Sequence, residues 1–98
     1  MSAQIRGLLG FAMRSGKVCV GASKALEQVE RQKAALVLLD EGAAPNTRDK
    51  LIHRCQGAQV PCRVLPEGLL GQAIGRPHTV AVALLHGDIA RKLTQELP

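Results

Sequence analysis

Two continuous apolar runs constrain the fold of this chain more than any other feature of its sequence. Ala35 to Leu39 reads A-L-V-L-L, and Thr79 to Leu85 reads T-V-A-V-A-L-L. Neither run alternates apolar with polar side chains, so each predicts a strand that is buried on both faces. A sheet with two such strands needs helices on both of its sides.

Helical patterns alternate with the predicted strands along the chain. Apolar residues recur three and four positions apart in five segments, which start near Ile5, Ala22, Asn46, Leu69 and Asp88. Shorter strands are predicted at 18–20 and 60–65. Because Pro61 cannot donate to a ladder, it indicates that the second strand lies at a sheet edge or that Pro61 stands at the strand's very start. In that strand we expect Val60, Cys62 and Val64 to face inward. The pattern predicts an α/β protein, a three-layer α/β/α sandwich on a four-stranded mixed sheet, with residues 1–98 as one domain.

Residues with capping preferences mark the expected helix ends. Gly16 suits a C-terminal cap after the first helix. Asn46 is expected to cap the third helix, with Asp49 returning a capping-box contact, and Gly57 to close it. Asp88 is expected to cap the last helix.

The charge balance favours a polyanionic partner. Thirteen basic and eight acidic side chains leave a net charge of +5. Four cations precede the first acid, Glu27, so the first quarter of the chain holds most of this excess. Phe11 is the one aromatic residue. A surface that stacks bases on exposed rings is therefore not expected, and nucleic acid would be bound through backbone groups, cations and shape.

The cysteines and the lack of a long apolar segment indicate the cellular compartment in which we expect the protein. Cys19, Cys55 and Cys62 are odd in number and form no C-x-x-C pair, so we expect buried structural thiols and no disulfide framework. A zinc site from these thiols and His53 would match no common ligand spacing, and no metal or other cofactor is expected. Because no apolar segment is long enough to span a membrane, we expect a cytoplasmic protein.

The stretch from Arg14 to Lys24 carries three cations and no carboxylate. It ends where Gly21 begins the second helix, and a glycine there leaves the first backbone N–H groups uncovered at the positive end of the helix dipole. Such a site accepts phosphate or the acceptor edge of a base. The stretch is equally compatible with a solvated helix start in which Ser23 assists the cap.

Two enzymatic interpretations are disfavoured. Gly10 to Lys17 fails as a nucleotide phosphate loop because five residues separate its glycines, Val18 replaces the magnesium-binding hydroxyl, and the segment follows a helix. The three histidines are scattered, and no serine or cysteine stands at a nucleophile motif. We therefore expect no catalysis and no small-molecule substrate.

A second basic segment precedes the last apolar run. Gly75 to Thr79 reads G-R-P-H-T, in which Pro77 stiffens the loop and Arg76 offers a planar fork for phosphate or guanine. Taken alone, the segment also matches a plain connection between a helix and a strand.

In this order, the motifs resemble the kink-turn-binding ribosomal protein family, in its small bacterial YlxQ-like branch. The resemblance covers nearly the whole chain, through L-L-G-F-A-M-R-S-G-K-V (8–18), the glycine that starts the second helix, A-A-L-V-L-L-D-E (34–41), P-N-T (45–47), V-P-C (60–62), L-G-Q-A-I-G (70–75) and V-A-V-A (80–83). It implies the α/β/α sandwich and binding to an RNA kink-turn, a helix–bulge–helix element with tandem sheared G·A pairs.

The resemblance also implies which residues bind the RNA. The small-residue turn that enters the groove maps to Gly21 and Ala22, and the asparagine–glutamate pair that follows it maps to Ser23 and Lys24. The expected RNA-binding set further includes Lys17, Glu27, Arg31, the loop near Ala44 and Pro45, and the loop that holds a flipped-out nucleotide, Arg76, Pro77, His78, Thr79 and Val80.

Two positions depart from the family pattern. Ser23 has one hydroxyl where an asparagine presents an acceptor and two donors, so base readout should weaken. Loss of one good bidentate contact costs about 1–3 kcal/mol of discrimination. Glu27 places a carboxylate where a phosphate-facing cation is expected, and Lys24 can compensate.

We therefore expect a monomeric, non-catalytic RNA-binding protein that stabilises a bent ribosomal or leader RNA and associates with the ribosome. Two alternatives stay open at this point. One is a protein-interaction adaptor on the same fold, and the other is a module that presents substrate to an RNA-modifying enzyme.

Overall fold

The two apolar runs form the centre of a four-stranded sheet. The computed structural model describes residues 3–97, in which nine elements follow one another. They are α1 (Ala3–Arg14), β1 (Val18–Val20), α2 (Ala22–Glu30), β2 (Ala34–Asp40), α3 (Pro45–Ala58), β3 (Cys62–Leu65), α4 (Leu69–Ile74), β4 (Ala81–Leu85) and α5 (Asp88–Glu96).

The sheet has the strand order β1-β4-β2-β3. β4 runs antiparallel to both β1 and β2, whereas β2 and β3 run parallel, so the sheet is mixed. The two fully apolar strands therefore lie side by side in the middle, and the shorter strands form the edges. The edge position predicted for the strand after Pro61 is confirmed.

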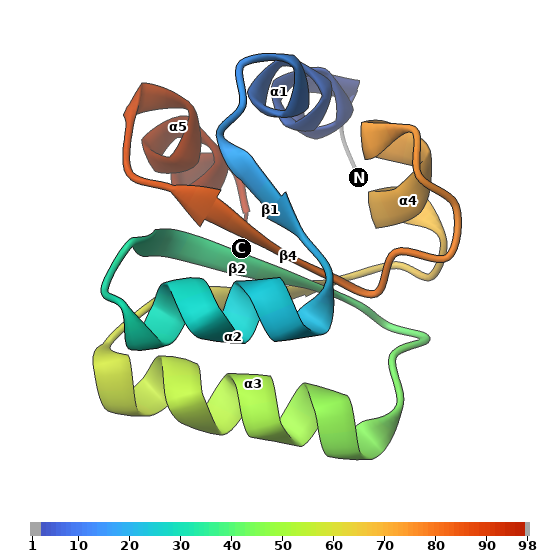
Figure 1. Cartoon of the computed structure of the whole chain (residues 1–98). Helices are drawn as coiled ribbons and strands as arrows, with labels where there is room; N and C mark the ends of the chain where they lie inside the picture. Colours follow the sequence, from blue (N-terminus) through green and yellow to red (C-terminus); the bar gives the residue numbers. More distant parts are fainter. Residues whose placement is uncertain (1–2, 98) are drawn as a thin grey trace.

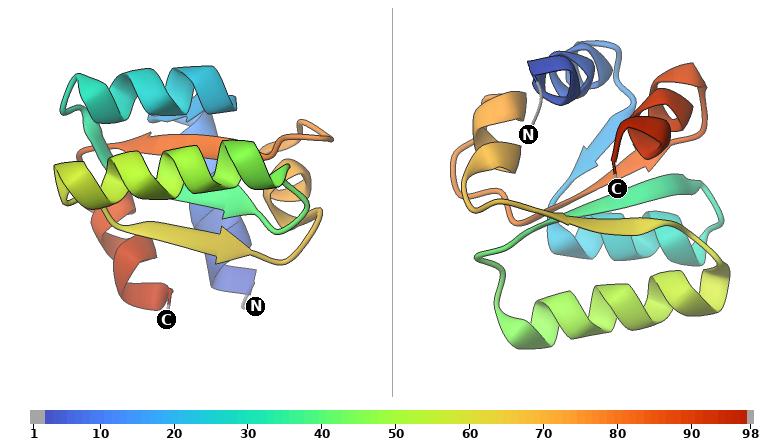
Figure 2. Two further views of the ribbon diagram at one scale, coloured as in Figure 1. Left: turned by 90° about the horizontal axis from the view of Figure 1, so that it is seen from below. Right: turned by 180° about the vertical axis from the view of Figure 1, so that it is seen from behind.

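Helices cover both faces of the sheet (Figure 1). Helices α1, α4 and α5 lie on one face, and α2 and α3 lie on the other, an arrangement that is also visible from below and behind (Figure 2). Alternate residues of β2 serve the two sides, because Leu36 and Leu38 join the core under α1, α4 and α5 while Val37 and Leu39 join the core under α2 and α3. The predicted three-layer α/β/α sandwich is confirmed.

Two predicted helix caps are wrong, the first by two positions in the chain and the second by one. Ala44 is the N-cap of α3, which begins at Pro45, and no side chain caps it. Proline suits the first helical position because its missing N–H is not needed there, so the helix starts before Asn46. Gly87 is the N-cap of α5, and Asp88 is its first residue. There the carboxylate still complements the helix dipole and pairs with Arg91 at 3.2 Å.

The end of α3 and the start of β3 also differ from expectation. The helix continues past Gly57 to Ala58, and Gln59 adopts the left-handed conformation that ends it. The Val60 N–H donates to the Cys55 carbonyl at 2.8 Å, so Val60 belongs to the helix end. Val64, expected to face inward, is 46% exposed, whereas Leu65 is buried, because β3 is an edge strand with no further strand beside it.

The single aromatic residue is exposed. Phe11 is 52% accessible on α1, so one ring is available at the surface. Within residues 3–97, no helix has both the length and the apolar character that crossing a bilayer would require.

The sheet register supplies a matched pair for testing the core. Leu39 and Val64 are register partners on β2 and β3, but Leu39 is fully buried and Val64 is not. We expect Leu39→Ala to lower the free energy of unfolding by about 2–5 kcal/mol, because it leaves a cavity. The control Val64→Ala should cost less than about 1 kcal/mol. Urea unfolding measures both, and equal losses would contradict the two-sided burial of β2.

Candidate nucleic-acid interface

Three segments meet at one end of the sheet. They are the start of α2, the loop between β2 and α3, and the loop of residues 75–80 between α4 and β4, all on the right of Figure 1. Backbone hydrogen bonds join them. The Gly21 N–H donates to the Ala81 carbonyl at 2.9 Å, and the Asp40 N–H donates to the Val80 carbonyl at 2.8 Å. The start of α2 and the end of β2 are thus both held beside the 80–81 junction where the loop enters β4.

The start of α2 presents uncovered backbone donors. Gly21 has φ 109°, a conformation that other residues rarely adopt, and it is the N-cap without a side-chain hydrogen bond. The next helical turn carries Ala22, Ser23 and Lys24, of which Ser23 and Lys24 are exposed. The alternative in which the Ser23 hydroxyl assists the cap has no support in this geometry, because no side chain makes that bond.

The loop of residues 75–80 is held in one shape by its own backbone. The Arg76 carbonyl accepts a bond from the Thr79 hydroxyl at 2.7 Å and a longer one from the Thr79 N–H at 3.3 Å. His78 has φ 71°, the left-handed region that few non-glycine residues occupy. The loop also packs on α4 at Gly71, where an added Cβ would lie 2.8 Å from the Arg76 carbonyl oxygen. Only a glycine at position 71 permits this approach.

Asp40 connects the two loops that flank the end of β2, and sequence reasoning missed it. Its Oδ2 accepts the Gly42 N–H at 2.7 Å and its Oδ1 accepts the Gly68 N–H at 2.8 Å. Asp40 is 5% exposed and is the one buried charged side chain among residues 3–97. A buried acid is uncommon unless its oxygens are paired, so an acid placed after a run of buried strand residues was the signal in the sequence.

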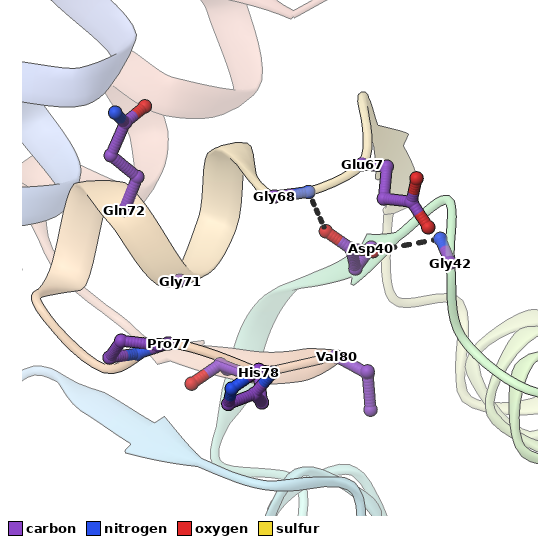
Figure 3. Close-up of a pocket in the computed structure, with 10 residues that line it drawn as sticks. Asp40, Gly42, Glu67, Gly68, Gly71, Gln72, Pro77, His78 and Val80 are labelled. Atoms are coloured by element: carbon purple, nitrogen blue, oxygen red, sulfur yellow. Dashed lines mark hydrogen bonds between the residues drawn. The ribbon is translucent and has the colours of Figure 1, made fainter.

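A pocket of about 620 Å³ opens beside this carboxylate. The loop of residues 75–80 forms one wall and the Asp40 connection the other, and the Gln72 side chain points away from the space (Figure 3). The residues that line it are Asp40, Gly42, Glu67, Gly68, Gly71, Gln72 and residues 77–80.

Basic and acidic side chains occupy different places at this end of the sheet. Lys24 and Arg76 are exposed, and within the described part of the chain neither forms an ion pair. Glu67 lines the pocket, and Glu41 is exposed at the end of β2. The end of the sheet therefore combines two unpaired cations with acidic groups at the pocket.

The structure brings together most of the residues that the sequence predicted for binding, but not all. Residues 21–24, Ala44, Pro45 and residues 76–80 share this end of the sheet. Lys17 does not, because β1 separates it from Gly21 by about 13 Å of extended chain. Arg31 lies about 15 Å from Gly21 along the axis of α2.

Glu27 and Arg31 neutralise each other in part. Their side chains pair at 3.1 Å on the surface of α2 and are 56% and 57% exposed. An ion pair this exposed is worth little, so either residue can exchange its partner for a ligand. No cluster of three or more metal-ligating side chains exists within residues 3–97.

Comparison with known proteins identifies relatives of this chain. Residues 3–92 match the model of the ribosomal protein L7Ae/L30e/S12e/Gadd45 family. The RNA-binding protein YlxQ of Bacillus subtilis (strain 168) is 37% identical over 87 residues, which cover 88% of this chain and 87% of that protein. The protein of the same name from Enterococcus faecium is 32% identical over 91 residues, with coverage of 92% and 86%.

Solved structures share the fold. A protein with unknown function from Bacillus halodurans C has a TM-score of 0.90 and 29% identity, with 96% of each chain covered. The 15.5kD RNA binding protein of Giardia lamblia has a TM-score of 0.82 over 99% of this chain and 90% of that one. Its identity of 22% supports the fold alone.

The role of Asp40 can be tested with a neighbouring control. In Asp40→Asn, an amide NH₂ replaces one of the two carboxylate oxygens. The backbone N–H of Gly42 or Gly68 that this oxygen accepted then faces a donor and loses its hydrogen bond. We expect the free energy of unfolding to fall by about 1–3 kcal/mol. Glu41 is the exposed neighbour, and Glu41→Gln makes the same change from carboxylate to amide. It should leave the urea midpoint unchanged. Equal midpoints for the two variants would exclude a structural role for the Asp40 carboxylate.

Proposed function

Because this chain belongs to the ribosomal protein L7Ae/L30e/S12e/Gadd45 family, we propose that it is a non-catalytic RNA-binding protein whose target is a kink-turn or a similarly bent RNA. The names of the relatives from Bacillus subtilis and Enterococcus faecium support RNA as the partner. We further propose that residues 1–98 act as one cytoplasmic domain on ribosomal or leader RNA.

The hydrogen bond between Gly21 and Ala81 is the observation that carries this proposal. It fixes the uncovered start of α2 beside the rigid loop of residues 75–80. Backbone N–H groups at a helix start bind phosphate oxygens and base acceptors, and the helix dipole strengthens both interactions. Small residues at 21 and 22 let an RNA groove approach the backbone closely.

In this proposal the two loops divide the work of recognition. Ser23 and the neighbouring N–H groups contact base edges at the sheared G·A pairs, while Lys24 and Arg76 neutralise phosphates. Residues 77–80 hold an extruded base against the pocket, with Ala44 and Pro45 beside it. Arg31 reaches a phosphate further along the RNA once it leaves Glu27.

A rigid site of this kind selects a conformation of the RNA. The loop of residues 75–80 is fixed by hydrogen bonds within it and to β2, so the protein does not need to reorganise on binding. A free kinked RNA is a minor conformer, and a ligand that binds only this conformer shifts the population toward it. Stabilising the bent RNA is thus the function, and no bond is made or broken.

A gel shift with two RNAs tests the target. One is a kink-turn, and the other is the same RNA with the sheared G·A pairs replaced by Watson–Crick pairs. We expect tighter binding to the first by about tenfold or more, the discrimination that one or two good base contacts provide. Equal affinity would reject kink-turn recognition and would favour a role as an adaptor or as a substrate-presenting module.

Paired charge variants test the site. We expect Lys24→Ala with Arg76→Ala to weaken kink-turn binding strongly and to flatten the slope of log affinity against log salt, from about −2 to −3 toward −1.

The control, Lys33→Ala with Lys92→Ala, removes the same charge at exposed positions on other elements. It should keep the tight binding and most of the slope. Melting temperatures should be nearly unchanged in both double variants, because all four side chains are exposed. Similar losses in the two variants would mean that the site is misplaced and that only net charge matters.

A further inference from the structure

A pair of thiols lies at the other end of α3, away from the proposed RNA site. Cys55 is in the last turns of α3, and Cys62 is the first residue of β3. The chain reverses between them, because the Val60 N–H donates to the Cys55 carbonyl at 2.8 Å. The Cys62 side chain packs against the core cluster that contains Cys55. The expectation of buried thiols holds for Cys55 alone, because Cys62 and Cys19 are partly exposed.

Solvent-sized molecules can reach this pair. A surface pocket of about 300 Å³ lies between α3 and the edge strand β3, and both cysteines line it. Cys55 itself is 1% exposed, whereas Cys62 is partly exposed on the edge strand β3. A small oxidant can therefore approach the pair, whereas a macromolecule cannot reach the Cys55 sulfur.

The contact makes the two thiols chemically unequal. The hydrogen bond from the Cys62 thiol lowers the pKa of Cys55, although burial opposes this effect. The same bond raises the pKa of Cys62, and its burial adds to the increase. The hydrogen bond therefore favours the ionised form at Cys55 over Cys62, the arrangement of a nucleophile beside a resolving thiol.

We propose that Cys55 and Cys62 form a redox-active dithiol, which a hydroperoxide converts into an intramolecular disulfide that joins α3 to β3. This site is independent of the proposed RNA binding, because α3 begins beside the RNA site and carries Cys55 toward its opposite end. A disulfide needs the sulfurs to approach to about 2.05 Å, and both cysteines already line the same pocket.

The chemistry balances in two steps. In the first, the Cys55 thiolate attacks one oxygen of hydrogen peroxide, the O–O bond breaks, and a sulfenic acid and hydroxide form. In the second, the Cys62 sulfur attacks the sulfenic sulfur, the S–O bond breaks, and the hydroxyl leaves as water with the Cys62 proton. The two thiols lose two electrons in total, and the peroxide is reduced.

Peptide mapping of the oxidised wild-type protein is a direct test. The folded chain is treated with hydrogen peroxide, alkylated and digested with trypsin. Cleavage after Arg54 and Arg63 releases one peptide, Cys55–Arg63, that contains both thiols, while Cys19 lies in the separate peptide Val18–Lys24. We expect the first peptide to lose two hydrogens and resist alkylation until a reductant is added. The Cys19 peptide should be alkylated throughout.

Two variants and a thermal measurement complete the test. In Cys62→Ser, Cys55 should be oxidised to the sulfenic acid or to higher acids and should form no disulfide. Cys19→Ser should form the Cys55–Cys62 disulfide as the wild type does. The oxidised wild type should melt several degrees higher than the reduced protein, because the bond closes an eight-residue ring across the α3–β3 junction.

Independent alkylation of Cys55 and Cys62 after peroxide treatment would overturn the dithiol. So would a disulfide that includes Cys19. An unchanged or lower Tm after oxidation would overturn the joining of α3 to β3. The mapping uses the wild-type chain, so it stands even if a cysteine variant fails to fold, and it does not depend on any RNA measurement.

Discussion

The antiparallel pairing of β2 with β4 is the constraint on which the rest of the molecule depends. Both strands are buried on both faces, and their register sets Leu39 opposite Ala81. Because the end of β2 then lies beside the start of β4, Asp40 can bond to Val80 and the start of α2 can bond to Ala81. The candidate interface is a consequence of where these two strands stop.

The three segments of the candidate interface are held in place by buried residues beneath them. Asp40 supplies one, through charge-assisted hydrogen bonds to Gly42 and Gly68, which are stronger than neutral ones. Gly71 supplies another by leaving room for the Arg76 carbonyl. A buried carboxylate and a buried glycine thus hold the loop of residues 75–80 and the pocket in a defined shape. In the proposed complex, the pocket would complement a bent RNA by its shape, because Glu67 at its edge gives it no favourable charge.

The three layers could be predicted from patterns that extend over many residues. The helix caps and the membership of the site could not, because single contacts decide them. The apolar runs and the helical spacings predicted the order of elements and the mixed sheet, because each is an average over many side chains. The caps at Asn46 and Asp88 were wrong because a neighbouring Pro45 or Gly87 suits the helix start better. The family resemblance placed Lys17 and Arg31 in the expected RNA-binding set, but a strand and a helix carry them about 13 and 15 Å from Gly21. Asp40 was overlooked because its partners, Gly42 and Gly68, come from two different loops.

The α3 helix separates two kinds of chemistry within one small chain. Its first residues, after Ala44, lie beside uncovered backbone donors and unpaired cations, which suit a polyanion. Its last turns carry Cys55 against the edge strand, where the sheet has no further strand to cover it and Cys62 stays accessible. Helix α3 packs against α2, and its 14 residues span about 21 Å, which separates its two ends. Oxidation at one end can therefore stiffen the sandwich without altering the groups that would meet an RNA at the other.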